Sequence, residues 1–123
     1  MNQDKAWTVF VVDDEPIISQ TLAAILNQAG FHAKAFNLPE PALDAAKSSP
    51  PDLLISDVVM PGMTGIELAI EFQKHVPKCK ILLFSGQART ADLLEQANEQ
   101  GYNFEVLAKP IHPKDLLAKL RAL

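Results

Sequence analysis

Short apolar runs alternate along this chain with longer segments in which apolar residues recur at helical spacing. Each run has the length of a strand, and the continuous apolar character of the first suits a strand buried on both faces, whereas residues 32–36 form a weaker run. The predicted strands are residues 8–13, 32–36, 53–57, 80–85 and 104–108. The predicted helices begin at Pro16, at Pro39 or Pro41, and at Ile66, Thr90 and Pro113. Because crossovers between parallel strands are right-handed, this alternation predicts a five-stranded parallel sheet with five helices covering both of its faces.

Size and composition are those of an ordinary globular domain. With 123 residues, 48% of them hydrophobic, the chain is long enough to bury a core without disulfides. It contains no repeat, low-complexity tract or linker, so we expect residues 1–123 to form one domain without an output domain.

Charge and hydropathy restrict the partners and the location that we expect. The formal net charge of -4 gives no general attraction to nucleic acid or to anionic membranes. The first five residues are polar and lack a secretory signal, and no apolar run approaches the roughly 20 residues of a membrane span. A single cysteine excludes an intramolecular disulfide. We therefore expect a cytoplasmic protein that makes no direct contact with nucleic acid and does not insert into membranes.

Four of the predicted strands lead into residues that can bind a metal or a phosphoryl group. Asp13 and Asp14 lie at the end of the first strand, and Asp57 ends the third. Ser85 ends the fourth strand and Lys109 follows the fifth. The carboxyl ends of parallel strands meet at one edge of a sheet, where open α/β sheets bind their ligands. We expect three carboxylates, one hydroxyl and one ammonium to converge there.

Each of these residues has an ordinary structural explanation when it is considered alone. An Asp after a strand is commonly a turn residue or a helix cap, and Asp13 or Asp14 would suit the start of the helix at Pro16. The group is harder to explain in this way. Two unit charges about 4 Å apart repel by roughly 4 kcal/mol at an effective dielectric constant of about 20. Gathering three carboxylates therefore requires cations, which Lys109 and a divalent metal would supply.

The donor set indicates a particular chemistry. Mg²⁺ favours carboxylate, water and phosphate oxygens, so it suits a site of this composition. With a metal screening its charge, Asp57 becomes an oriented nucleophile that can form an aspartyl phosphate. Lys109 and the Ser85 hydroxyl would then stabilise the oxygens of the transferring group.

Four motifs resemble those of the receiver domain of two-component response regulators, and the resemblance covers almost the whole chain. They are VVDDEP at 11–16, LISDVVMPGMTG at 54–65, Ser85-Gly86 and Lys109-Pro110. The resemblance implies a doubly wound, flavodoxin-like fold with strand order 2-1-3-4-5. It also implies that Asp57 accepts a phosphoryl group from a sensor histidine kinase or a histidine phosphotransfer protein.

The resemblance further assigns a role to each residue of the site. Asp13, Asp14 and Asp57 would hold Mg²⁺ together with the backbone carbonyl of Val59, with Asp14 binding more directly than Asp13. Lys109 would pair with Asp57 and then with the phosphoryl group.

Activation and output are also implied by the resemblance. Ser85 would turn toward the phosphoryl group on activation, and Lys109-Pro110 resembles the cis peptide of the family. The surface formed by residues 90–100, 104–108 and 113–122 corresponds to the family's output face. It would contact a downstream effector protein or a second copy of the chain.

Two positions have consequences for switching and for lifetime. Three residues before the lysine, members of the family usually carry Tyr or Phe, whereas this chain has Val106. We expect the switch at Ser85 to remain while its aromatic readout is absent or rerouted. Val59 and Gln87 occupy the positions that flank the path of the hydrolytic water. Because an apolar Val59 cannot position that water, we expect a persistent phosphoryl group.

The leading interpretation is a phosphorylation-dependent signalling switch rather than a turnover enzyme. One alternative is an Mg²⁺-dependent phosphohydrolase with an aspartate nucleophile. Such enzymes usually place a second Asp two residues after the nucleophile, where this chain has Val59. The other alternative is a receiver that binds partners without phosphorylation. The complete set of acidic, hydroxyl and lysine residues argues against it, and only Val106 favours it.

Overall fold

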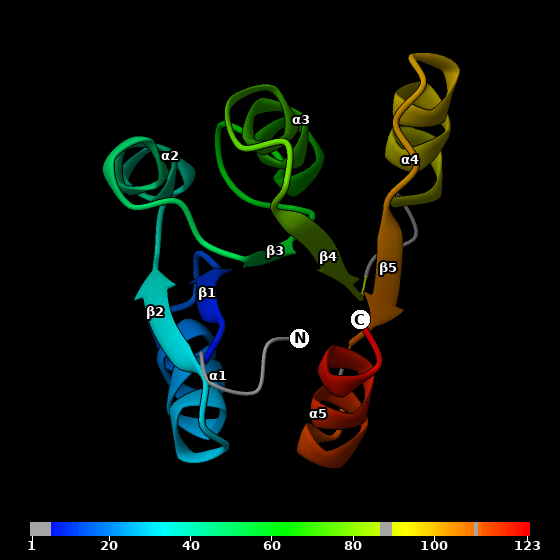
Figure 1. The fold of residues 1–123 in the computed structure, drawn as a ribbon. Helices are drawn as coiled ribbons and strands as arrows, with labels where there is room; N and C mark the ends of the chain where they lie inside the picture. Colours follow the sequence, from blue (N-terminus) through cyan, green and yellow to red (C-terminus); the bar gives the residue numbers. More distant parts are fainter. Residues whose placement is uncertain (1–5, 87–89, 110) are drawn as a thin grey trace.

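The computed structural model describes residues 6–86, 90–109 and 111–123. Strands and helices alternate along these residues in the order that the sequence predicts (Figure 1). The strands are β1 (Thr8–Val12), β2 (His32–Phe36), β3 (Leu53–Asp57), β4 (Lys80–Ser85) and β5 (Glu105–Ala108). The helices are α1 (Pro16–Gln28), α2 (Pro39–Ser48), α3 (Gly65–His75), α4 (Thr90–Glu99) and α5 (Pro113–Arg121). In the described part of the chain, no helix has both the length and the apolar character needed to cross a bilayer.

All neighbouring strands of the sheet are parallel, and their spatial order is β2-β1-β3-β4-β5. This order confirms the predicted doubly wound, flavodoxin-like fold. From β1 the chain first winds outward to β2, and it then returns past β1 to β3, so the direction of winding changes between β1 and β3. Doubly wound sheets bind their ligands at the carboxyl ends of the strands beside such a change.

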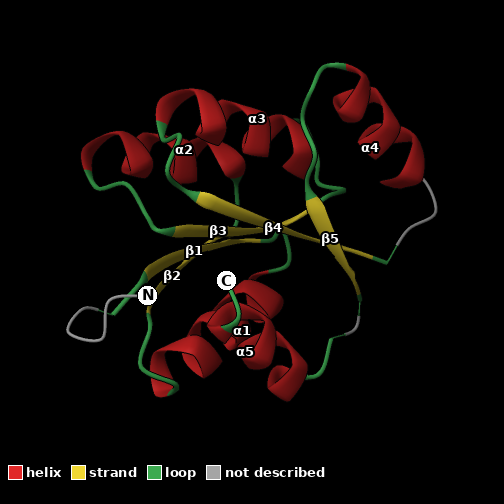
Figure 2. Ribbon diagram, turned by 45° about the vertical axis from the view of Figure 1, so that its right-hand side comes forward, coloured by secondary structure: helices red, strands yellow, loops and turns green. Residues whose placement is uncertain are grey.

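Helices cover both faces of the sheet, with α1 and α5 on one face and α2, α3 and α4 on the other (Figure 2). Successive residues of a strand point to opposite faces, so the central strands contribute to two cores. Val9 and Val11 pack with residues of α1 and α5, whereas Phe10 packs with residues of α2 and α3. All three are at most 2% exposed, and burying each such side chain stabilises the fold by roughly 1.5–3 kcal/mol. The central strands are therefore held from both faces and position the residues at their ends.

The predicted boundaries of the strands agree with the structure to within one residue. We expected the first strand to include Asp13, but β1 ends at Val12, and the Asp13 side chain accepts a hydrogen bond from the Glu15 amide at 2.9 Å as the chain turns. We expected the last strand to begin at Phe104, but β5 begins at Glu105. Differences of one residue are normal for the ends of regular elements. They leave the predicted site residues at the carboxyl edge of the sheet.

Candidate functional site

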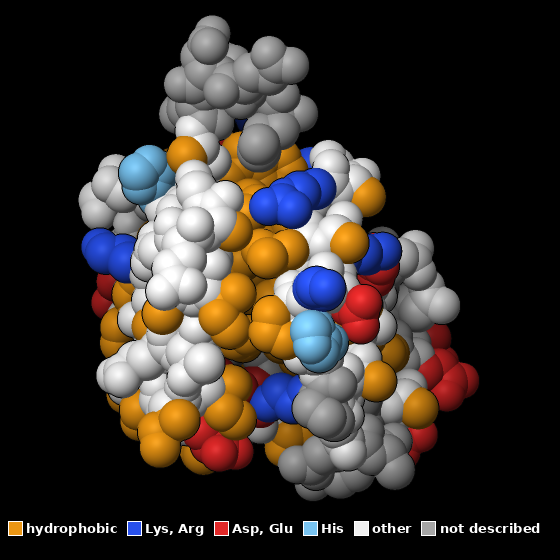
Figure 3. Space-filling view, turned by 90° about the horizontal axis from the view of Figure 1, so that it is seen from below, with side chains coloured by type: hydrophobic (Ala, Val, Ile, Leu, Met, Phe, Trp, Pro, Cys, Tyr) orange, Lys and Arg blue, Asp and Glu red, His pale blue; other side chains and the backbone are white. Residues whose placement is uncertain are grey.

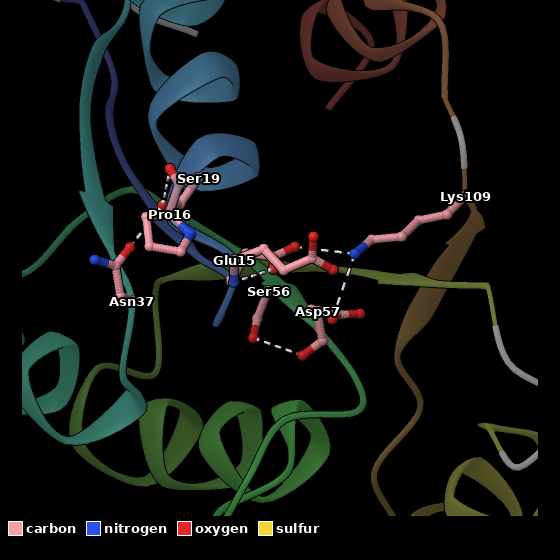
Figure 4. Close-up of polar contacts among 8 residues, drawn as sticks. Glu15, Pro16, Ser19, Asn37, Ser56, Asp57 and Lys109 are labelled. Carbon is pink, nitrogen blue, oxygen red and sulfur yellow. Dashed lines mark hydrogen bonds and ion pairs between the residues drawn. The ribbon is translucent and has the colours of Figure 1, made fainter.

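The carboxyl edge of the sheet brings together the side chains that the sequence singles out. Asp13 and Asp14 follow β1, Asp57 is the last residue of β3, and Lys109 follows β5. Figure 4 shows the Lys109 side chain extending across this edge to Asp57. The predicted convergence of the three carboxylates and the lysine is present in the structure.

Lys109 forms ion pairs with two of the carboxylates. Its Nζ lies 2.9 Å from Oδ2 of Asp13 and 3.3 Å from Oδ2 of Asp57. The sequence reasoning anticipated the contact with Asp57 but not the shorter one with Asp13. Burial alone would lower the pKa of Lys109, but its hydrogen bond to Asp13 and the charges of Asp57 and Asp13 outweigh burial and raise the pKa. The ammonium therefore stays charged at neutral pH.

Asp13 is the most deeply placed of the three carboxylates, with only 3% of its side chain exposed. One of its oxygens accepts the hydrogen bond from the Glu15 amide, and the other accepts the bond from Lys109. Both oxygens are therefore already engaged within the chain. Asp14 and Asp57 are more accessible than Asp13, so they are better placed to meet a ligand that arrives from solvent.

Burial is the largest influence on the pKa of Asp57. Burial raises the pKa of Asp57, and the charges of Asp13 and Asp14 raise it further, while Lys109 lowers it. The net shift is upward because burial, together with the like charges of Asp13 and Asp14, outweighs the lowering by Lys109. Desolvation and nearby like charges both disfavour the ionised carboxylate, which explains the direction.

A divalent cation fits this cluster. Each of Asp13, Asp14 and Asp57 offers a carboxylate oxygen, and these oxygens all lie within 4.8 Å of one another. The donors are oxygens only, the type that Mg²⁺ prefers. A cation beside Asp57 would also stabilise the ionised carboxylate, which burial disfavours.

Ser85 ends β4 at the same edge and is buried. Its carbonyl accepts a hydrogen bond from the Lys109 amide at 3.0 Å, and it pairs in register with Ala108. The strand that carries the lysine is therefore tied to the residue expected to respond to a phosphoryl group. Val59 lies two residues beyond Asp57, is half-buried, and packs with the apolar cluster under α3 and α4.

The loop that follows Asp57 depends on a glycine whose importance the sequence reasoning missed. The Gly65 amide donates to the Val58 carbonyl at 2.8 Å, which folds the start of α3 back against the end of β3. A Cβ atom on Gly65 would lie 2.0 Å from the Asp57 carbonyl oxygen. No side chain fits in that gap, so Gly65 allows α3 to approach the backbone of Asp57. Thr64 and Glu67 complete the turn with a reciprocal capping box, and the sequence signal is a threonine followed three residues later by glutamate.

Two buried serines hold the backbone around the site. Ser56 is fully buried, and its hydroxyl donates to the Asp57 carbonyl at 2.9 Å. Ser19 is also fully buried and donates to the side-chain oxygen of Asn37 at 2.9 Å. The second contact ties α1 to the loop after β2 (Figure 4). One hydroxyl thus satisfies the carbonyl at the end of β3, and the other holds the loop after β2 against α1.

An apolar groove of about 390 Å³ lies next to the site, between α1 and α5. It is lined by Ile17, Ile18, Thr21, Leu22, Ile25, Phe84, Lys109, Ile111 and Pro113. Figure 3 shows hydrophobic side chains gathered in a band on this face of the molecule. Ile17 is 80% exposed and Lys109 belongs to both the groove and the site. The groove therefore shares Lys109 with the carboxylate site.

Val106, at the position where the family usually has an aromatic residue, belongs to an apolar cluster. Val106 is half-buried, pairs with Leu83, and packs in the cluster that also includes Tyr102 and Phe104. The expectations that concern Gln87 and Pro110 fall outside the described residues. The rerouted readout therefore stays a prediction, as does the cis peptide.

Comparison with known proteins places this arrangement in context. The chain matches the family model of the response regulator receiver domain over residues 9–121. It is 34% identical over 116 residues to the transcriptional regulatory protein CreB of Escherichia coli (strain K12), a match that covers 94% of this chain and 50% of CreB. It is 30% identical over 115 residues to the response regulator receiver protein CpdR of Brucella abortus (strain 2308), a match that covers 94% of both chains. The chain thus spans half the length of one relative and almost all of the other.

Solved structures show the same fold. The chemotaxis protein CheY4 of Vibrio cholerae has a TM-score of 0.81 at 29% identity, over 96% of this chain and 98% of that one. A CheY-like receiver domain protein of Methanospirillum hungatei has a TM-score of 0.85 at 23% identity, over 96% of this chain and 93% of that one.

Proposed function

Because the chain belongs to the family of response regulator receiver domains, we propose that it is a phosphoacceptor switch whose acceptor is Asp57. The observation that carries the proposal is the geometry at the carboxyl edge of the sheet. There the Lys109 ammonium lies 3.3 Å from Asp57, among carboxylates whose oxygens are within 4.8 Å of one another. We further propose that a sensor histidine kinase or a histidine phosphotransfer protein donates the group.

The reaction uses the partly accessible carboxylate of Asp57. A carboxylate oxygen forms a bond to phosphorus as the bond between phosphorus and the donor's histidine nitrogen breaks, and that nitrogen keeps the electron pair. Lys109 stands beside the nucleophile and donates N–H groups to the phosphoryl oxygens. Its short contact with Asp13 keeps it charged and in place before transfer. Asp13 therefore acts on Asp57 through the lysine.

Asp14 and Asp57 would hold Mg²⁺ together with Asp13 and the Val59 carbonyl. When bound, the ion supplies the charge stabilisation that the oxygens of a transferring phosphoryl group require. Asp14 is the most exposed of these three carboxylates, whereas both oxygens of Asp13 are engaged by Glu15 and Lys109.

We propose that the output passes through Ser85 to the surface of α4, β5 and α5. Ser85 and Lys109 are joined by a backbone hydrogen bond, so a movement of either residue is transmitted to the other. The downstream partner is an effector protein or a second copy of this chain. The charges on this surface suit a second copy, because α4 is acidic, whereas α5 carries Lys114 and Arg121 beside Asp115; the third basic residue of α5, Lys119, is paired with Glu105.

The phosphodonor would dock on the groove between α1 and α5. A donor's histidine must reach Asp57. The groove lies near that residue, because Lys109 both lines the groove and forms an ion pair with Asp57. The exposed Ile17 offers apolar surface to a donor at the start of α1. A small phosphodonor would not need this surface.

The decisive experiment is phosphorylation by acetyl phosphate with Mg²⁺, followed by intact mass measurement. We expect the wild-type chain to gain one acid-labile phosphoryl group, and we expect Asp57→Asn to gain none. Chelation of the metal should abolish the gain. A wild-type chain that gains no mass would refute the proposal, and sustained turnover of a generic phosphate ester would favour a phosphohydrolase instead.

A further inference from the structure

A hollow of about 240 Å³ lies between the carboxyl-terminal half of α4 and the segment that leads into β5. It is lined by Leu94, Glu95, Asn98, Tyr102, Asn103 and Phe104. In Figure 1 this segment runs alongside α4 before β5 begins. The hollow is at the amino end of β5, whereas Lys109 follows the carboxyl end of that strand. It is therefore separate from the carboxylate site.

The segment that forms the hollow is acidic. Residues 90–104 contain Asp92, Glu95 and Glu99 and no Lys, Arg or His. Glu95 is exposed and lines the hollow, and no basic nitrogen of the described residues lies within the 4.0 Å of an ion pair from its carboxylate. The last carbonyls of α4 add the negative end of the helix dipole, and no basic side chain in the last turn offsets it. By contrast, the next acidic residue along the chain, Glu105, is paired with Lys119.

The hollow also presents aromatic rings. Tyr102 and Phe104 are half-buried and stack with their ring centroids 6.1 Å apart and an angle of 11° between their planes. Both rings pack against the apolar cluster under α4, which fixes their orientation. The face of an aromatic ring attracts cations, and a planar guanidinium can stack on it as well. The amide oxygens of Asn98 and Asn103 add hydrogen-bond acceptors at the rim.

We propose that this hollow binds the side chain of an arginine that a partner protein presents. The guanidinium stacks on the Tyr102 ring and donates hydrogen bonds to the carboxylate of Glu95. The charge of α4 determines which kind of partner can bind. An acidic segment would be repelled by α4, and a purely apolar segment would leave the Glu95 carboxylate without a counter-charge. Binding does not require phosphorylation of Asp57. The hollow lies on the α4 and β5 part of the surface proposed for output, so the inference rests on that proposal and names the side chain by which a partner is recognised there.

The test is a titration of the isotope-labelled full chain with N-acetyl-argininamide, followed by backbone amide NMR. N-acetyl-citrullinamide is the control, since it has the same shape without the charge. We expect saturable shifts confined to residues 94–104, with citrulline binding at least about threefold more weakly because the ion pair and the cation–π contact are lost. Equal binding of the two ligands, or no saturable shift in this segment, would overturn the proposal.

Two variants distinguish binding in the hollow from general electrostatic attraction to the acidic helix α4. Glu95 is exposed, so Glu95→Gln should fold normally, and it should weaken arginine binding by about threefold. Asp92→Asn removes the same charge from the same helix outside the hollow, and it should leave the affinity unchanged within error. Equal weakening by the two variants would show that arginine is held by general electrostatics, and this would overturn the assignment. All measurements use unphosphorylated protein, so they are independent of the outcome at Asp57.

Discussion

The gap at Gly65 leads to a quantitative prediction, because a single added carbon probes the contact between α3 and the backbone of Asp57. In Gly65→Ala the new Cβ would lie 2.0 Å from the Asp57 carbonyl oxygen and 2.8 Å from its carbonyl carbon. Both neighbours are backbone atoms that cannot rotate away. The first turn of α3 or the end of β3 must therefore shift.

The expected cost follows from two opposing effects. Forcing an atom into a filled space costs about 1–3 kcal/mol, and contacts with backbone place Gly65→Ala at the upper end. Replacing glycine by alanine in a helix returns about 1 kcal/mol. The net loss of unfolding free energy is therefore about 2 kcal/mol, which lowers the melting temperature by roughly 6–10 °C in a chain of this size.

Two other glycines provide matched controls. In Gly86→Ala the new atom would meet nothing closer than the Lys109 Cβ at 3.5 Å, which is an ordinary contact. The unfolding free energy should then stay within about 0.5 kcal/mol of wild type. Gly30 has open space but a φ of 99°, so Gly30→Ala should cost about 1–2 kcal/mol through backbone strain alone.

Urea unfolding of the three variants measures these differences, and phosphorylation of Asp57 by acetyl phosphate measures the functional consequence. Because the shift at Gly65 displaces the backbone of the acceptor, we expect Gly65→Ala to be phosphorylated more slowly even well below its unfolding midpoint. If Gly65→Ala unfolds at the same urea concentration as Gly86→Ala, the close approach of α3 to Asp57 does not exist as described.

Three further predictions concern the pocket and its surroundings. The pKa of Asp57 in the folded chain lies above its ordinary value of 3.8, so folding favours the neutral carboxyl group. This contribution to the free energy of unfolding is fully present below pH 3.8 and is lost as the pH rises through the folded pKa. Without metal, Asp57→Asn should therefore melt at a higher temperature than wild type at pH 7 and at about the same temperature below pH 3.8; an equal or lower melting temperature at pH 7 would contradict the raised pKa of Asp57. Val59→Asn adds an amide that can orient water, so it should shorten the lifetime of the phosphoryl group, and an unchanged decay rate would exclude the role of Val59. Ile17→Ala removes the exposed apolar group beside the site, so transfer from a histidine phosphotransfer protein should slow while labelling by acetyl phosphate is unaffected; equal slowing of both reactions would argue against docking on α1.

Local patterns were sufficient to predict the sheet and the location of the site. Short apolar runs and helical spacing define the elements, and right-handed crossovers then restrict the topology of parallel strands. Asp57 and Ser85 were placed correctly because each ends a short buried run, and such runs can only be strands in an alternating α/β chain. The resemblance of the motifs added the strand order, which the structure confirms.

Contacts between distant residues were beyond the reach of these patterns. Lys109 and Asp13 are 96 residues apart, and nothing near either residue indicates that their contact is shorter than the one with Asp57. The requirement for Gly65 depends on how closely α3 approaches β3, which is a matter of packing. The stacked rings of Tyr102 and Phe104 and the hollow beside Glu95 arise from the path of the chain between α4 and β5.

The sequence by itself determined which residues stand at the ends of the strands, because burial on two faces requires continuous apolar runs and leaves polar residues where each run stops. Only the tertiary structure decided how those residues share charge. The distance from Lys109 to each carboxylate, and the burial that raises the pKa of Asp57, depend on the stagger of three strands and on the helices packed against them. Electrostatic energies vary steeply with distance and solvent access, and neither quantity is encoded in a local pattern.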